Sequence, residues 1–241
     1  MSAAGPPQFA NSAPAGGRAA AKPQAWGDHA SSHSTRLVAV EAVRDPRRLS
    51  ATARARFESH LAEILVALGL DLDSEGTRDT PARLLDAWIE STSGYDADAK
   101  LVTTFAIERI AGEAGDSAQV VEGPIPLTAL CEHHALPFFG HAWVGYVASD
   151  RLIGLSKLTR VVRQFSHRFT VQERIGREVA AALEAIVAAR GVAVRIEAAH
   201  LCTRMRGVRD SEAKTASTTW RGNYEHSEAL RREFLELCVR R

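Results

Sequence analysis

The sequence predicts a single folded domain of the α+β class, and two observations support this fold class. The periodicity of the apolar residues changes in blocks: two helical segments come first, followed by strands, two more helices, further strands and a final helix. Blocks of this kind favour antiparallel strand pairing over repeated βαβ units. The composition, with 45% hydrophobic and 24% charged residues, is that of a globular protein with a buried core.

The first 50 residues differ from the rest of the chain in composition. Residues 1 to about 35 are rich in Ala, Gly, Pro and Ser and have no apolar periodicity, so they cannot bury enough surface to offset their ordering entropy. We therefore predict a disordered or poorly ordered tail over residues 1–50 and a folded domain over residues 51–241.

The domain begins with a predicted pair of helices. Apolar residues recur at helical spacing over residues 52–70, and a glycine near the end provides a stop. Asp79 precedes a Thr-Pro pair and is suited to cap a second helix, which we expect to end at Gly94. The first strand is predicted over residues 101–110.

Two strands and a helix follow. The strands are predicted over residues 119–130 and 138–147, and the helix over residues 155–169. The helix has one apolar stripe, formed by Leu155, Leu158, Val162 and Phe165.

The remaining elements follow the same reasoning. Thr170 and Glu173 have capping-box spacing and would open a helix that runs to Arg190, just before a glycine. Alternating residues predict strands over 192–205 and 214–221. A last amphipathic helix is indicated by Leu230, Phe234, Leu237 and Cys238.

Charge and cysteine content exclude several classes of protein. A net charge of +1 and a pI near 7.9 argue against a general binder of nucleic acid or membrane surfaces. No apolar run approaches the length of a membrane span, and the N-terminus lacks the apolar core of a secretory signal. Three cysteines cannot form a paired disulfide framework and fit a reducing compartment, which predicts a cytoplasmic protein.

Residues 131–134, Cys-Glu-His-His, are the densest group of metal-ligand side chains. The thiolate of Cys131 and the imidazole of His134 could close on one Zn²⁺ if the backbone turns there, but a third ligand is needed. On the strand predicted over 192–205, His200, Cys202 and the arginines at 204 and 206 would share one face. Two unconnected buried thiols remain the alternative reading.

If Cys202 is the third ligand, the set has the character of a catalytic zinc site. Three protein ligands leave the fourth position open to water, whose pKa such a metal lowers toward about 7. His133 and His200, beside the ligands, could then carry protons. Cys238 lies on the apolar stripe of the last helix and is expected to pack there.

A basic helix face supplies a possible anion site. Lys157, Arg160 and Gln164 follow one another opposite the apolar stripe, which could simply be a solvated surface. Together with Arg206 the cations could instead neutralise a polyphosphate. Glu173 could cap its helix or accept two N–H groups from a guanine edge, and the sequence leaves both roles open.

Four motifs occur in a fixed order and spacing. They are Cys131-Glu132-His133-His134, Ile153-Gly154-Leu155-Ser156-Lys157-Leu158, Val171-Gln172-Glu173-Arg174 and His200-x-Cys202-x-x-x-Arg206-Gly207. This set resembles the GTP cyclohydrolase I family over about residues 52–240. The chain departs from the common family pattern at Ala129, Thr170 and Trp220, none of which is a proposed ligand or proton carrier.

The resemblance implies a role for each site residue. Cys131, His134 and Cys202 would hold zinc, and His133 and His200 would transfer protons. The triphosphate of GTP would be bound by Lys157, Arg160 and Arg206. The guanine or the reaction intermediate would be bound by Ser156, Gln172 and Glu173.

The resemblance also implies a reaction and an assembly. The family opens the purine ring of GTP at C8, releases formate and forms 7,8-dihydroneopterin triphosphate. Its tunnelling fold, an antiparallel sheet with helices on one face and an N-terminal helix pair, assembles into a toroidal homodecamer with active sites at subunit boundaries. The alternatives are a paralogue with the same zinc chemistry in a deazapurine or specialised pathway, and a non-catalytic zinc-stabilised nucleotide-binding protein.

Overall fold

The structure, a computed structural model, describes residues 48–96, 98–102, 104–107 and 119–239. The tail predicted over residues 1–50 therefore lies almost wholly outside the described residues. None of the helices in the described part is long and apolar enough to cross a membrane. In chain order the elements are α2 (Ala51–Ala67), α3 (Thr80–Ser91), η1 (Ser93–Tyr95), η2 (Ala99–Val102), β1 (Thr104–Ala106), β2 (Gln119–Cys131), β3 (Pro137–Val147), β4 (Arg151–Ile153), α4 (Leu155–Ser166), β5 (Phe169–Thr170), α5 (Gln172–Val187), β6 (Gly191–His200), α6 (Leu201–Arg204), β7 (Thr215–Gly222), α7 (Asn223–His226) and α8 (Glu228–Val239).

The helices α2 and α3 form the predicted N-terminal pair. The Ser50 hydroxyl caps α2 by accepting a hydrogen bond from the Ala53 N–H at 3.1 Å. An ion pair of 2.7 Å between Arg54 and Asp86 joins the two helices. The second helix ends at Ser91, three residues before the predicted stop, and a 3-10 turn that includes Gly94 follows it.

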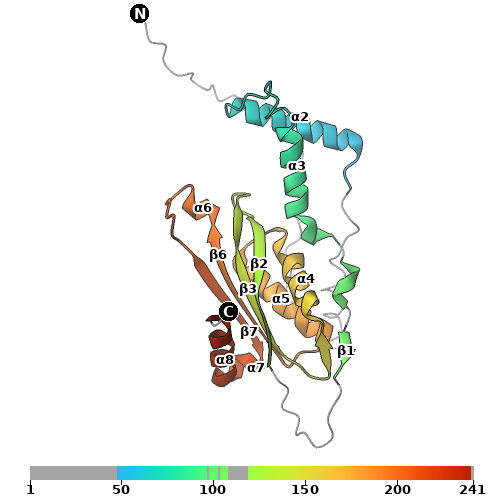
Figure 1. The fold of residues 1–241 in the computed structure, drawn as a ribbon, viewed down its shortest axis with the longest axis vertical. Coiled ribbons are helices and arrows are strands. Elements are labelled where there is room, and N and C mark those ends of the chain that lie inside the picture. The colour runs from blue at the N-terminus through green and yellow to red at the C-terminus, as the bar shows by residue number, and fades with distance from the viewer. Residues whose placement is uncertain (1–47, 97, 103, 108–118, 240–241) are drawn as a thin grey trace, which may run out of the picture. The chain divides into compact units, whose positions relative to one another are not determined.

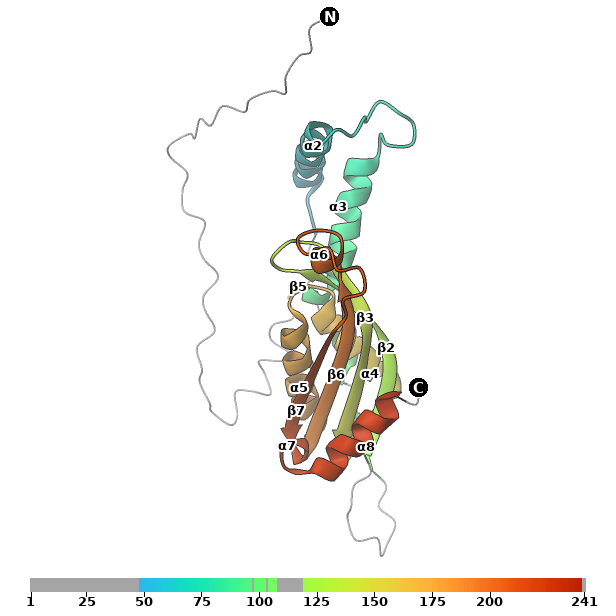
Figure 2. The same ribbon diagram turned by 90° about the vertical axis from the view of Figure 1, so that its left-hand side faces the viewer.

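The main sheet has five strands in the order β5-β2-β3-β6-β7 (Figures 1 and 2). Strands β2, β3, β6 and β7 pair antiparallel, whereas β5 pairs parallel with the last two residues of β2. A separate two-stranded sheet joins β1 and β4. The α+β class with antiparallel pairing is therefore confirmed, and the two strands predicted over 119–130 and 138–147 are observed with shifts of one residue.

The core lies between one face of the sheet and the helices α4 and α5. Every second residue of β6 from Val192 through Ile196 is at most 1% exposed and belongs to this cluster, as period-two alternation requires. The opposite face carries a smaller cluster, formed by Trp143, Val147, Ala193, Tyr224, Phe234 and Cys238. Figure 1 shows α7 and α8 on the side of the sheet away from α4 and α5. The expectation of helices on one face only is therefore wrong, because the apolar stripe of α8 needs its own sheet surface.

The predicted capping box of α5 does not form. Thr170 lies in β5, where its carbonyl accepts a hydrogen bond from the Glu132 N–H at 3.2 Å, and the N-cap residue is Val171, with no side-chain cap. Thr170 is thus used for strand pairing and does not cap α5 as predicted. The helix ends at Val187 rather than at Arg190, because Ala188 adopts a left-handed conformation with φ of 49°.

The strand predicted over 192–205 is shorter than expected at its C-terminal end. Its partner β3 begins at Pro137, and Phe138 already pairs with His200, so the only β3 residue left beyond that point is Pro137, which has no N–H to donate. The chain turns instead into the single helical turn α6, closed by a hydrogen bond of 3.0 Å from the Met205 N–H to the Leu201 carbonyl. Cys202 therefore lies on a helical turn and not on a strand.

The strand predicted over 101–110 is also shorter. Residues 99–102 form a 3-10 helix, and β1 spans only Thr104–Ala106. Residues 108–118 lie outside the described part of the chain.

The apolar stripe of α4 gives a test of the core. Leu158 is fully buried, whereas Leu155, predicted to be on the same stripe, is 57% exposed. We expect Leu158→Ala to lower the free energy of unfolding by about 2–5 kcal/mol through lost burial and the cavity left behind. Leu155→Ala is the matched control and should change it by less than about 0.5 kcal/mol. Denaturant titration followed by circular dichroism measures both, and equal losses would contradict the assigned orientation of α4.

Candidate metal centre

The connection between β2 and β3 is a tight turn that carries the Cys-Glu-His-His motif. The Cys131 N–H donates to the Leu136 carbonyl at 2.8 Å, and the Ala135 N–H donates to the Cys131 carbonyl at 2.8 Å. Ala135 has a φ of 54°, the left-handed conformation that reverses the chain. We call residues 131–136 the metal loop. Its turn brings His134 back beside Cys131.

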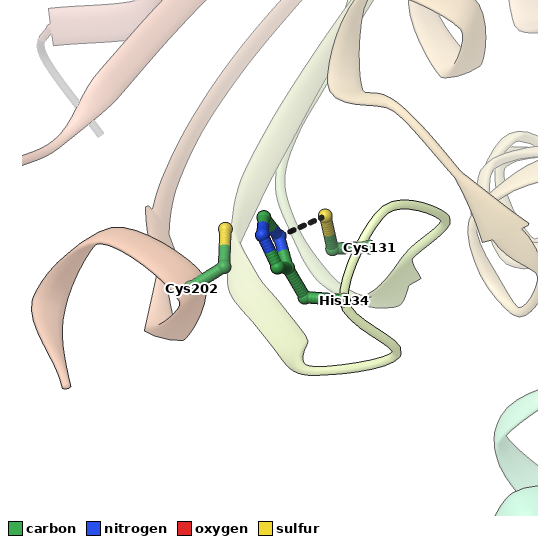
Figure 3. A group of neighbouring side chains, drawn as sticks. All are labelled: Cys131, His134 and Cys202. Carbon is green, nitrogen blue, oxygen red and sulfur yellow. Dashed lines mark hydrogen bonds between the residues drawn. The ribbon is translucent and has the colours of Figure 1, made fainter. Parts of the chain in front are cut away.

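The three predicted ligands come together at this loop. The ligand atoms of Cys131, His134 and Cys202 all lie within 4.8 Å of one another, with Cys202 supplied by α6 (Figure 3). Cys131 is buried, Cys202 is half-buried and His134 is exposed. Cys238 lies elsewhere, buried in the cluster under α8, as its packing role predicted.

The donor set and its spacing fit a tetrahedral metal ion. With Zn–S and Zn–N bonds of about 2.3 and 2.0 Å, tetrahedral geometry places neighbouring ligand atoms about 3.5–3.8 Å apart. The distance from Cys131 Sγ to His134 Nδ1 is 3.9 Å, and all the ligand atoms lie within 4.8 Å of one another, so the three side chains need to shift by only about 1 Å to reach these separations. Burial and the adjacent Cys131 thiol raise the pKa of the Cys202 thiol. A bound cation would overcome this effect, because coordination deprotonates thiols.

Two further histidines lie beside the group. The His133 Nδ1 atom is 3.9 Å from Cys131 Sγ, on an exposed side chain. His200 stacks on Phe138 with ring centroids 4.5 Å apart and an interplanar angle of 6°. Burial lowers the pKa of His200, with a smaller opposing effect from the Glu173 carboxylate. The imidazole of His200 is therefore half-buried and lies close to the metal loop.

Gln172 and Glu173 are adjacent residues in opposite environments. Gln172 is 1% exposed, its Nε2 lies near three acceptors on β6 and β7, and its Oε1 is 2.9 Å from His200 Nε2. Glu173 is exposed in the first turn of α5. The amide of Gln172 is therefore buried and hydrogen-bonded within the fold, whereas the carboxylate of Glu173 is accessible to a ligand.

The predicted cations divide into two groups. Arg206 reaches the metal loop, where its Nη1 lies 2.9 Å from His134 Nε2. Ser156 and Lys157 lie in the first turn of α4. This turn begins near the C-terminal end of β3, the end away from the metal loop, because the N–H of Ile153, two residues before α4, contacts the Tyr146 hydroxyl at 3.4 Å.

The basic face of α4 is consequently remote from the metal loop of the same chain. The C-terminal end of α4 is the one that adjoins β5 and the metal loop. From Lys157 to Ser166 the helix rises about 14 Å. Arg160 is paired with Asp98 at 2.9 Å, and Gln164 is buried, with its Nε2 donating to the Gly94 carbonyl at 2.8 Å. The described part of one chain thus brings the ligands, both histidines, Gln172 and Arg206 together, and leaves Ser156, Lys157 and Arg160 apart.

Two acidic residues that were not predicted to have a role, Glu132 and Asp98, form ion pairs in the structure. Glu132, in the metal loop, forms a two-pronged ion pair with Arg174 on α5, one contact being 3.1 Å. This hydrogen bonding outweighs burial and holds the pKa of Glu132 below its usual value. For Asp98, burial is outweighed by hydrogen bonds from the Lys100 N–H and Arg160, which lower its pKa. Glu132 and Arg174 each lie in one of the four sequence motifs, which is the feature of the sequence that points to them.

Comparison with known proteins agrees with these motifs. A family model described as GTP cyclohydrolase I matches residues 57–239. A GTP cyclohydrolase 1 of Mycolicibacterium vanbaalenii is 42% identical over 192 residues, covering 78% of this chain and 92% of the relative. Those of Alkalilimnicola ehrlichii and Gloeobacter violaceus are 38% and 39% identical, covering 76% and 72% of this chain and 96% and 79% of the relatives. This chain therefore belongs to the GTP cyclohydrolase I family.

Proposed function

We propose that this protein is a zinc-dependent GTP cyclohydrolase that opens the purine ring of GTP at C8, releases formate and forms 7,8-dihydroneopterin triphosphate. The observation that carries the proposal is the Cys131–His134–Cys202 group with His133 and His200 beside it. A purely structural metal site closes all four positions with protein and needs no adjacent proton carriers. Membership of the family, over residues 57–239, supports the same reaction.

Each part of the site has a proposed task. Zinc held by Cys131, His134 and Cys202 would supply a water of lowered pKa for attack on the purine. His133 and His200 would take and return protons as the imidazole ring of the substrate opens. The exposed carboxylate of Glu173 is suited to accept N–H groups from a guanine edge.

The triphosphate would be bound by cations from two places. Arg206 projects beside the metal loop, and Lys157 and Arg160, with Ser156 next to them, lie on the first half of α4. Because the α4 residues are remote from the metal loop of their own chain, we propose that they serve the metal centre of a neighbouring copy. The active site would then form at the boundary of a homo-oligomer, which we propose to be the toroidal decamer of the tunnelling fold, acting in the cytoplasm.

The direct test is turnover of GTP by purified protein with a parallel metal count. We expect about one zinc per chain by the three-ligand argument, formate release, and a product that becomes fluorescent on oxidation. Removal of the metal with a chelator should abolish turnover, and added zinc should restore it. GTP left intact by fully loaded protein would contradict the assignment and favour a nucleotide-binding protein or a paralogue with another purine substrate.

The ligand set can be tested apart from activity. Cys131→Ala should lose most of the bound zinc and turnover, because two remaining ligands hold zinc poorly. Cys238→Ala is the matched control: its thiol lies in the cluster under α8, so zinc content should stay at the wild-type level. Metal analysis after gel filtration measures both. Full zinc content in Cys131→Ala would remove Cys131 from the ligand set.

The shared site can be tested by mixing inactive variants. Cys131→Ala lacks the metal half of the site and Lys157→Ala lacks part of the phosphate half. If the halves come from different copies, random co-assembly of the two gives intact sites at up to about a quarter of the boundaries. At low GTP, the turnover rate of the mixture should then exceed the sum of the rates of the two separate variants. Mixing Cys131→Ala with Cys202→Ala, both in the metal half, should restore nothing, and an equal lack of restoration in both mixtures would contradict sharing.

A further inference from the structure

The buried amide of Gln172 can adopt only one orientation. Its Nε2 lies 3.1 Å from the Ile196 carbonyl, 3.1 Å from the Thr215 carbonyl and 3.0 Å from the Ser217 hydroxyl oxygen. Backbone carbonyls only accept hydrogen bonds, so the end of the amide that faces them must be the NH₂ group. The side chain is 1% exposed, which leaves no room for solvent to replace these partners.

This orientation determines which nitrogen of His200 carries a proton. The opposite end of the amide, Oε1, is 2.9 Å from His200 Nε2. A carbonyl oxygen can only accept, so His200 must donate from Nε2. A neutral imidazole has a single N–H, and the lone pair is therefore on Nδ1.

The surroundings of His200 hold the ring in this position. Phe138 stacks against the imidazole almost in parallel, at 4.5 Å. A flip of the ring would place a carbon atom against Gln172 Oε1 and lose the hydrogen bond. Stacking thus fixes the plane of the ring, and the hydrogen bond to Gln172 fixes which edge of the ring faces the amide.

We propose that Gln172 is a positioning residue that keeps His200 protonated on Nε2, so that His200 exchanges protons with the substrate through Nδ1. This role takes the place of direct contact between Gln172 and guanine, because both ends of the amide are bonded inside the fold. The adjacent Glu173, which is exposed, remains the guanine contact. The inference rests on the proposed function, in which His200 transfers protons.

The tautomer of His200 is the first measurement. Long-range nitrogen–proton NMR of zinc-loaded protein labelled with ¹⁵N-histidine, with the His200 signals identified from a His200→Asn variant, distinguishes a protonated from a lone-pair nitrogen. We expect Nε2 protonated and Nδ1 unprotonated in the wild type. A proton on Nδ1 instead would overturn the proposal, and this measurement requires no variant of Gln172.

Two variants separate positioning from a merely structural role. Gln172→Met keeps the length of the side chain but removes both polar ends, and should give mixed His200 tautomers. The kcat should fall about 10- to 100-fold, less than the full contribution of about 10²- to 10⁴-fold of a general acid–base group, because His200 itself remains. The KM for GTP should change less than about threefold. Ser217→Ala removes one partner of Nε2 but keeps the His200 bond, so tautomer and kcat should stay near wild type.

The outcomes also separate this inference from the proposed function. An unchanged tautomer in Gln172→Met, or a raised KM with unchanged kcat, would overturn the positioning role and favour guanine contact. A wild-type protein that leaves GTP intact would contradict the proposed function, while the tautomer measurement would still decide the contact between Gln172 and His200.

Discussion

The geometry of the candidate site depends on a two-residue stretch of parallel pairing between β5 and the end of β2. Leu130 pairs with Phe169 and Cys131 with Thr170, next to the first ligand. Since β5 leads directly into α5, this pairing places Gln172 and Glu173 beside the metal loop. The ion pair between Glu132 and Arg174 spans the same junction, but its side chains are 30% and 41% exposed, so it contributes about 0–1 kcal/mol. Backbone pairing, rather than this ion pair, therefore sets the position of the start of α5 beside the metal loop.

The parts of the fold that could be predicted are those whose pattern is local. The strand at 119–130 and the pair of N-terminal helices follow from periodicity, and the structure confirms both. The errors occur where a distant segment decides the local structure. The capping pattern at Thr170 is overridden by pairing with β2. The strand predicted through Cys202 ends at His200 because beyond Phe138 β3 has only Pro137, which has no N–H to donate. Neither fact is visible in a window of neighbouring residues.

The candidate site shows the same division. Cys131, His134 and Cys202 could be chosen from the sequence because thiolate and imidazole groups are the ligands that zinc prefers. The different environments of Gln172 and Glu173 could not be predicted, since burial of one neighbour and exposure of the other depends on where β6 and β7 lie against α5. The distance of Lys157 from the metal loop likewise follows from the direction of α4, which periodicity does not report.

The separation of the metal loop from the basic half of α4 has a consequence for how the protein would be characterised. With the shared site proposed above, one copy contains everything needed to hold the ion but only part of what is needed to hold the nucleotide. Metal content then reports the folding of individual chains, whereas turnover reports their association. A preparation could therefore be fully loaded and yet lose specific activity on dilution, with no chemical damage to any chain.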